Sequence, residues 1–155
     1  MTLNKKKKMI RHAMLLERQK KSVYFCDSSY MAAKIFLKNI SLKKENLVGL
    51  YWPIRFEMDT RPLLKILFLN KIKVALPSMD HEKIVFKSWG LEDTLDFNRY
   101  KFYSPKKNRS TVTPDILVIP SIAIDSKGKP FCCGVPTIEV GEEKRCLNST
   151  LYPYY

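Results

Sequence analysis

Apolar and polar positions along the chain follow patterns typical of alternating helices and strands. Apolar residues three and four positions apart indicate amphipathic helices, and continuous apolar runs indicate strands covered on both faces. These patterns predict helices over about 5–21, 27–39 and 60–70, and strands over about 47–52, 73–77, 83–89 and 116–124. A strand, a helix and a strand within about 30 residues form a right-handed βαβ unit. The sequence therefore predicts an α/β fold, a doubly wound, Rossmann-like three-layer sandwich with a mainly parallel sheet.

The segment after residue 128 differs from the rest of the chain. Residues 129–155 show neither a helical nor a strand period and end in Tyr152-Pro-Tyr-Tyr155. In a doubly wound fold, a central strand such as 116–124 leads into a loop and a further covering helix, and the pattern predicts no such helix here. We therefore expect an α/β domain at 1–128, a divergent tail at 129–155, and an incomplete C-terminal part of the fold.

The charge balance is strongly basic. Lys and Arg number 28 against 15 Asp and Glu, a net charge of +13. This excess is compatible with a nucleic-acid partner, with an anionic small ligand such as a nucleotide, or with solubility alone. Apart from Lys5–Lys8 the basic residues are scattered, with no basic face interleaved with aromatic residues, so we expect no nucleic-acid partner. No apolar run is long enough to span a membrane and no signal peptide is evident, so we expect a cytoplasmic protein without a membrane partner.

Four cysteines are present, at Cys26, Cys132, Cys133 and Cys146. Two adjacent cysteines are poorly placed to supply two corners of a zinc tetrahedron, and no histidine lies near them in sequence. We therefore predict reduced thiols and no metal site in this set. The pattern assigns Cys132 and Cys133 no role.

The stretch 50–64 carries the most suggestive side chains. It joins the end of a buried strand to the start of a helix, where open α/β sheets bind ligands, and it places Trp52, Arg55 and Glu57 on the connecting turn. Glu57 is interpreted either as a solvated carboxylate favoured by the helix dipole or as an acceptor for a ring N–H of a planar ligand. Trp52 is interpreted either as core or as a stacking face. No catalytic triad, carboxylate pair or glycine-rich nucleotide motif is evident, so the catalytic residues are unknown.

The N-terminal helix carries a second candidate site. Lys7 and Arg11 are four residues apart and so share one helical face, a spacing that suits a phosphate or a carboxylate. The plainer interpretation of the lysine run Lys5–Lys8 is a solvated helix start. The residues alone thus predict an anionic-ligand site on an α/β domain.

Four segments in the same order resemble 5-formyltetrahydrofolate cyclo-ligase, also called 5,10-methenyltetrahydrofolate synthetase. They are Lys7-Lys-Met-Ile-Arg11, Tyr51-Trp-Pro-Ile-Arg-Phe-Glu-Met-Asp-Thr-Arg-Pro-Leu-Leu64, Val74-Ala-Leu-Pro77 and Pro114-Asp-Ile-Leu-Val-Ile-Pro-Ser-Ile-Ala-Ile-Asp-Ser-Lys-Gly128. The second and fourth segments are specific to the family. The resemblance covers the chain from about Lys5 to Gly128.

The resemblance implies an ATP- and Mg²⁺-dependent ligase of folate one-carbon metabolism. The formyl oxygen of 5-formyltetrahydrofolate attacks the γ-phosphate, N10 closes the ring, and phosphate leaves to give 5,10-methenyltetrahydrofolate. By the same resemblance, the ATP phosphates would contact Lys7, Lys8, Met9, Ile10 and Arg11, and the substrate would contact Arg11, Trp52 and Glu57. It implies a small-molecule substrate and a monomer, and it assigns no metal ligand in this chain.

The sequence departs from the family at two places. Phe56 stands where the family usually has Gly, and Lys129-Pro-Phe-Cys-Cys-Gly-Val-Pro-Thr-Ile-Glu139 stands where the family has a glycine-rich phosphate loop whose Asp helps to hold magnesium. Pro130 and Pro136 remove N–H donors that such a loop needs. The alternative is therefore a non-catalytic remnant that binds folate or nucleotide weakly. One hypothesis for the tail is translation out of frame, because a shifted reading of its codons can spell part of the missing loop.

Overall fold

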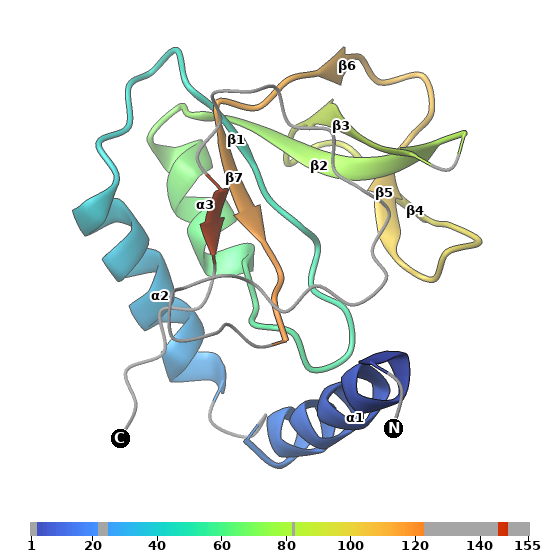
Figure 1. The fold of residues 1–155 in the computed structure, drawn as a ribbon. Coiled ribbons are helices and arrows are strands. Elements are labelled where there is room, and N and C mark those ends of the chain that lie inside the picture. Colours follow the sequence, from blue (N-terminus) through green and yellow to red (C-terminus); the bar gives the residue numbers. More distant parts are fainter. Residues whose placement is uncertain (1–2, 22–24, 82, 123–145, 149–155) are drawn as a thin grey trace.

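Helices and strands alternate along the chain, as the apolar pattern predicts (Figure 1). The computed structural model describes residues 3–21, 25–81, 83–122 and 146–148. The elements are α1 Leu3–Lys21, α2 Phe25–Asn39, β1 Leu47–Gly49, α3 Arg61–Leu69, β2 Lys73–Asp80, β3 Lys83–Trp89, β4 Leu95–Phe97, β5 Tyr103–Pro105, β6 Thr111–Val112, β7 Ile116–Ile119 and β8 Cys146–Asn148. The predicted α/β class is confirmed.

The main sheet has the strand order β6-β3-β2-β1-β7-β8. Strand β1 pairs in parallel with β2 and β7, and β8 is parallel to β7. The antiparallel part comprises β3, which pairs with β2 and with the short strand β6. The sheet is therefore mixed, and the carboxyl ends of its four parallel strands share one edge. Strands β4 and β5 form a separate two-stranded ribbon, and β5 contacts β2 and β3.

Helices α2 and α3 cover one face of the sheet and form the main core with it. Phe36 of α2 and Leu67 of α3 lie in one cluster with Val48, Leu76 and Trp89 of the strands. Leu67 and Val48 are fully buried. A smaller cluster on the opposite face has Ala75, Phe86 and Leu117 at its centre. Period-two alternation along β2 divides its side chains between these two clusters.

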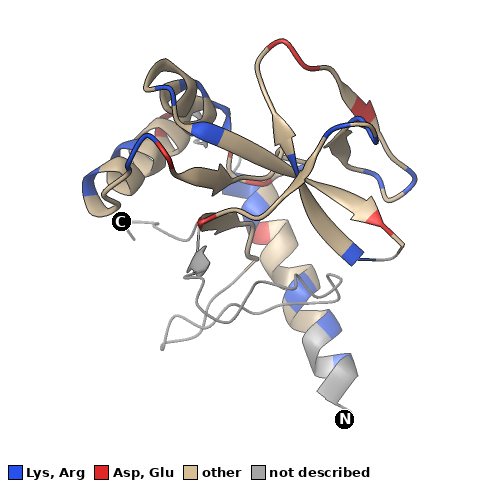
Figure 2. Cartoon of the chain, turned by 90° about the horizontal axis from the view of Figure 1, so that it is seen from above, with Lys and Arg blue, Asp and Glu red and all other residues tan. Residues whose placement is uncertain are grey.

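Helix α1 lies apart from α2 and α3. Figures 1 and 2 place it below the carboxyl ends of β1 and β7, on the other side of the sheet from the α2–α3 layer. Its apolar residues Met9, Met14 and Leu16 are exposed. Lys and Arg are distributed over helices, strands and loops rather than gathered on one element (Figure 2). No described helix combines the length and the hydrophobicity that a bilayer span requires.

Three parts of the sequence prediction need correction. Strand β1 ends at Gly49 rather than at residue 52, although the Leu50 amide still donates to the Ala75 carbonyl at 2.9 Å. The segment 90–113, for which no strands were predicted, contains β4, β5 and β6. The tail, which showed no strand period, contributes β8 beside β7. Some predictions lie outside the described residues. These are the end of the predicted strand 116–124, the turn that follows it, Cys132 and Cys133, and most of the tail at 129–155, including its boundary with the domain at 1–128.

Gly49 is the position where backbone and side chains approach most closely. A Cβ added there would lie 2.5 Å from Leu117 Cδ2, 2.9 Å from Pro114 Cγ and 3.1 Å from Phe86 Cε1. These atoms belong to packed, buried side chains, so they have little room to move.

We therefore expect Gly49→Ala to destabilise the fold by about 1–3 kcal/mol through overpacking. The midpoint of urea unfolding, followed by circular dichroism, measures this loss. Gly90→Ala is the matched control, because an added Cβ there meets only Asp93 Oδ2, at 3.6 Å. Equal midpoints for the two variants would contradict the tight packing around β1.

Candidate functional site

The loop between β1 and α3 is held in shape by its own hydrogen bonds. The Tyr51 hydroxyl donates to the Met58 carbonyl at 3.0 Å, and the Thr60 hydroxyl donates to the Tyr51 carbonyl at 2.6 Å. All three residues are buried. Buried hydrogen bonds of this kind are costly to break, so the loop is fixed at both ends. It lies at the carboxyl edge of the parallel strands, where α/β sheets bind their ligands.

Glu57 closes a tight turn within this loop. Its backbone amide donates to the Ile54 carbonyl at 3.1 Å, and its Oε2 accepts the Ile54 amide at 3.0 Å. Arg55, inside the turn, has a positive φ of 51°. The side chain and the backbone of Glu57 thus both form hydrogen bonds with Ile54, and these bonds hold the carboxylate in place. In the part of the chain that the structure describes, Oε1 of Glu57 has no hydrogen-bond donor.

The Glu57 carboxyl has an unusual electrostatic environment. Burial raises its pKa above the ordinary value of 4.5, and this effect outweighs the Ile54 amide and the positive charges of Arg18 and Arg55, which lower it. A partly desolvated carboxylate with one oxygen fixed and the other open is a strong acceptor for an N–H donor. The prediction of a merely solvated carboxylate does not fit this burial.

Trp52 packs against the core from the loop. Its ring meets that of Trp89 edge-on, with centroids 5.8 Å apart and an interplanar angle of 69°. Trp89 in turn contacts Phe68 at 5.7 Å. The interpretation of Trp52 as part of the core is therefore supported, and its partial exposure leaves surface for a ligand.

Arg18 connects α1 with the site, and the sequence reasoning missed it. Its guanidinium donates to the backbone carbonyl of Ser121, just beyond the end of β7, and its charge acts on Glu57. One side chain therefore links α1, the end of β7 and the β1–α3 loop. The helical period was the available signal, since positions 7, 11 and 18 share one face of a helix.

The phosphate-binding residues predicted on α1 lie farther along the same helix. Arg11 is seven residues and Lys7 eleven residues before Arg18, which places their backbones about 10 and about 16 Å away along the helix axis. Lys8 and Met9 are exposed, Arg11 is exposed, and Ile10 is half-buried. The helix therefore carries the predicted phosphate residues on the same element as Arg18, whose charge acts on Glu57.

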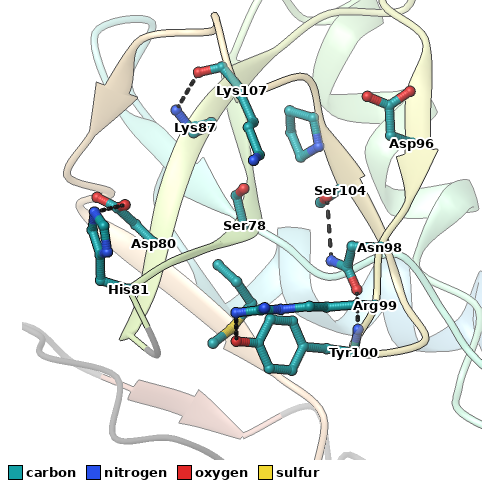
Figure 3. A pocket seen from close by; sticks show the side chains of 12 residues that line it. Ser78, Asp80, His81, Lys87, Asp96, Asn98, Arg99, Tyr100, Ser104 and Lys107 are labelled. Atoms are coloured by element: carbon teal, nitrogen blue, oxygen red, sulfur yellow. Dashed lines mark hydrogen bonds and ion pairs between the residues drawn. The ribbon is translucent and has the colours of Figure 1, made fainter.

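A polar cavity of about 790 Å³ opens at the carboxyl end of β2, next to the strand that carries the loop (Figure 3). Buried Lys87 lies in its wall and donates to the carbonyls of Lys107 and Arg109, both at 2.9 Å. The β4–β5 connection supplies Arg99, which donates to the Tyr100 hydroxyl at 2.8 Å and lies 4.9 Å from the centre of that ring. Sequence reasoning missed this cavity because it predicted no strands in the segment 90–113, which contains β4 and β5.

No metal centre is evident at these sites. In residues 3–21, 25–81, 83–122 and 146–148, no group of three or more His, Cys, Asp or Glu side chains is positioned to hold an ion. The described residues therefore offer cations on α1 and a carboxylate acceptor at Glu57, and no cluster of metal-binding side chains.

The described residues form an α/β domain with a loop at the carboxyl edge of its parallel strands. Comparison with models of known protein families gives no match, and comparison with curated protein sequences gives none either. Among the solved structures that share the fold are two synthetases. One is 5,10-methenyltetrahydrofolate synthetase from Aquifex aeolicus, with a TM-score of 0.68 and 23% identity over 83% of this chain and 67% of that one. The other is a 5,10-methenyltetrahydrofolate synthetase from Mycoplasma pneumoniae, with a TM-score of 0.68 and 14% identity over 92% of this chain and 83% of that one. The chain therefore has the fold of these synthetases, as the sequence resemblance implied.

Proposed function

We propose that this chain is a 5-formyltetrahydrofolate cyclo-ligase, a cytoplasmic monomer that converts 5-formyltetrahydrofolate to 5,10-methenyltetrahydrofolate with ATP. The observation that carries the proposal is the half-buried Glu57 carboxylate, held by the Ile54 amide in a hydrogen-bonded loop at the carboxyl edge of a fold shared with two synthetases. The pterin of a folate presents ring and amino N–H groups that such an acceptor recognises. No nucleic-acid or membrane partner is part of the proposal.

In this proposal Glu57 accepts a pterin N–H through Oε1, and Trp52 lines the pocket beside the ring. The cations of Lys7, Lys8 and Arg11 neutralise the phosphates of ATP. Met9 and Ile10 contact the phosphates from the same segment of the helix. ATP supplies the phosphoryl group that turns the formyl oxygen into a leaving group. The work of the protein is then to position the two substrates and to neutralise charge. Arg18 is a positioning residue, since it fixes α1 against the loop.

Magnesium fits the described residues less well than ATP does. The cations of α1 suit phosphate, whereas no cluster of three metal-binding side chains lies in the described part of the chain. Mg²⁺ therefore enters the proposal only as the usual partner of the ATP phosphates, and no step is assigned to a protein-bound ion.

The cavity at the end of β2 has room for the rest of the substrate. Strands β1 and β2 are parallel neighbours, about 4.8 Å apart, so the loop and the cavity occupy one edge. An aminobenzoyl ring suits the exposed Tyr100 face, and glutamate carboxylates suit Arg99 and Lys107.

The variant Arg99→Gln tests whether the glutamate end of the folate lies beside Arg99. We expect it to weaken binding of a folate that carries several glutamates by about threefold, because an exposed ion pair contributes at most about 1 kcal/mol. Binding of the form with one glutamate should change less. Lys106→Gln is the control, since Lys106 is exposed and is not among the cavity residues. If both variants bind the two folates like the unmodified chain, the glutamate end of the folate lies elsewhere.

The second candidate is a binding protein without turnover. It is favoured by Lys129–Glu139, whose two prolines and single glycine depart from a glycine-rich phosphate loop. The two candidates share the folate site and differ in the handling of ATP.

One assay separates them. The chain is mixed with 5-formyltetrahydrofolate, ATP and Mg²⁺, and the absorbance of the methenyl product is followed, while folate binding is measured by calorimetry. Turnover supports the ligase, and binding without turnover supports the remnant. If neither is seen with folded protein, both candidates fail.

A further inference from the structure

A second cleft lies at the opposite edge of the sheet, where β1 and β2 begin and β3 ends. It has a volume of about 480 Å³ and lies between the end of α3, the first residues of β2 and the loop that follows β3. Strand β2 is eight residues long, so the cleft is about 23 Å from the cavity at the carboxyl end of β2. Its floor residue Trp89 meets the Trp52 ring at 5.8 Å, so the cleft lies behind Trp52 without sharing a lining residue with the proposed folate site, and nothing in the proposed reaction uses it.

The floor of this cleft is apolar and partly aromatic. It contains Phe68, Ile72 and Trp89, and the two rings are 5.7 Å apart with an interplanar angle of 58°. Trp89 is buried, with 7% of its surface exposed, and its indole N–H donates to the Asp93 carbonyl at 3.2 Å. The Trp89 ring is thus held in place by this hydrogen bond, and its exposed edge can contact the aromatic ring of a ligand.

The rim of the cleft is cationic. Lys71, Lys73 and Arg109 line it, and no Asp or Glu is among the described residues that do so. Arg109 is held by Asp93, with Nη2 and Oδ2 2.7 Å apart. Lys71 and Lys73 are exposed and have no carboxylate partner in the described part of the chain. Two unpaired ammonium groups beside an apolar floor suit a ligand with one anionic end and one flat apolar end.

The backbone of one of these lysines is held beside the cleft by a hydrogen-bonded turn. Lys71 adopts a positive φ of 59° just after α3, and its amide donates to the Phe68 carbonyl at 2.9 Å. The next amide, of Ile72, donates to the Leu67 carbonyl at 2.9 Å. Glycine or asparagine is the usual residue at such a helix end, so a lysine here is uncommon. The two hydrogen bonds define the turn and so set the backbone position of Lys71.

We propose that this cleft binds a small aromatic anion, such as an aryl phosphate or an aryl carboxylate. The ring packs on Trp89 and Phe68, and the anionic group lies between Lys71 and Lys73. The proposal does not rest on the proposed folate reaction, because no residue that lines the cleft is assigned to that reaction, although Trp89 contacts Trp52.

Phenyl phosphate is the probe, and the full-length ¹⁵N-labelled chain is observed by two-dimensional NMR. We expect saturable shifts in the millimolar range at the amides of Lys73, Ser88 and Gly90 and at one indole N–H, that of Trp89. The chain has two tryptophans, so this indole signal is readily assigned. Shifts confined to the carboxyl edge, or no saturable shifts, would overturn the proposal.

Variants and neutral probes test the two parts of the ligand separately. The double variant Lys71→Glu with Lys73→Glu reverses two exposed charges and should weaken phenyl phosphate at least tenfold, whereas Lys65→Glu, on exposed α3 surface outside the cleft, should not. Benzyl alcohol and inorganic phosphate should each bind at least tenfold more weakly than phenyl phosphate. The proposed site is contradicted if Lys65→Glu weakens phenyl phosphate as much as the double variant does. It is also contradicted if benzyl alcohol or inorganic phosphate binds as tightly as phenyl phosphate.

Discussion

Glu57→Gln is expected to weaken folate binding by about ten- to hundredfold while leaving the fold at least as stable at neutral pH. A hydrogen bond to a charged acceptor is worth about 1.5–3 kcal/mol, which corresponds to that loss of affinity. Glutamine keeps an oxygen for the Ile54 amide, so the turn that depends on this bond at 3.0 Å is preserved. Calorimetric titration with 5-formyltetrahydrofolate measures the affinity.

The stability part of this prediction follows from the pKa of Glu57. Burial raises that pKa above its ordinary value of 4.5, so the folded state binds this proton more tightly than the unfolded state does. The corresponding stabilisation is present below the unfolded pKa and is lost as the pH rises through the raised folded pKa. At neutral pH the ionised Glu57 is therefore a cost to the fold, and the uncharged glutamine removes this cost.

The same pKa predicts how binding depends on pH. The N–H acceptor is the ionised carboxylate, so folate affinity should fall as the pH is lowered through the raised pKa, at a higher pH than for an ordinary glutamate. Glu45→Gln is the control, because Glu45 is exposed and lies ahead of β1, away from the carboxyl edge. A Glu57→Gln chain with unchanged folate affinity would show that the carboxylate does not hold the ligand.

Arg18→Ala is expected to have the second largest effect. The side chain joins α1 to the Ser121 carbonyl and supports the charge of Glu57. Its removal takes away this hydrogen bond between α1 and the end of β7, which should cost about 1.5–3 kcal/mol, the range for a hydrogen bond that involves a charged group. Proteolysis should then cut within α1 more rapidly, and binding of both ATP and folate should weaken.

A pH profile distinguishes this positioning role from simple destabilisation. Arg18 lowers the pKa of Glu57, so its loss should raise that pKa further and move the pH dependence of folate binding upward. Arg18→Lys should restore part of the profile, because it keeps the charge. Lys20→Ala is the control, since Lys20 is exposed and contacts only Glu17, at 3.1 Å, among the described residues. An unmoved profile in Arg18→Ala would contradict the coupling between α1 and the loop.

The elements with a clear apolar period were predictable from the sequence. The ranges of α3 and β3 match the prediction closely, because Leu63, Leu64 and Leu67 form a helical stripe and residues 83–89 alternate. Short polar strands were not predictable. Strands β4, β5 and β6 have three residues or fewer, and their pairing is set by tertiary contacts and not by an apolar pattern of their own.

The candidate site was predictable only in part. The apolar run through Tyr51 suggested a strand up to residue 52, but Leu50 and Tyr51 are buried because they anchor the loop, with the Tyr51 hydroxyl and carbonyl both used in its hydrogen bonds. Glu57 could be singled out by its place at the end of a strand. Its burial, and the approach of Arg18 from a helix 39 residues earlier in the chain, depend on the tertiary fold.

The roles of Lys7, Trp52 and Glu57 remain predictions, and their most direct test is the structure of the chain with bound 5-formyltetrahydrofolate. We expect a pterin N–H whose nitrogen lies about 2.7–3.2 Å from a Glu57 carboxylate oxygen, with the ring beside Trp52. We also expect the glutamate end near Arg99, in the cavity at the end of β2. A pterin bound away from the β1–α3 loop, with the Glu57 carboxylate still free of it, would contradict the central claim.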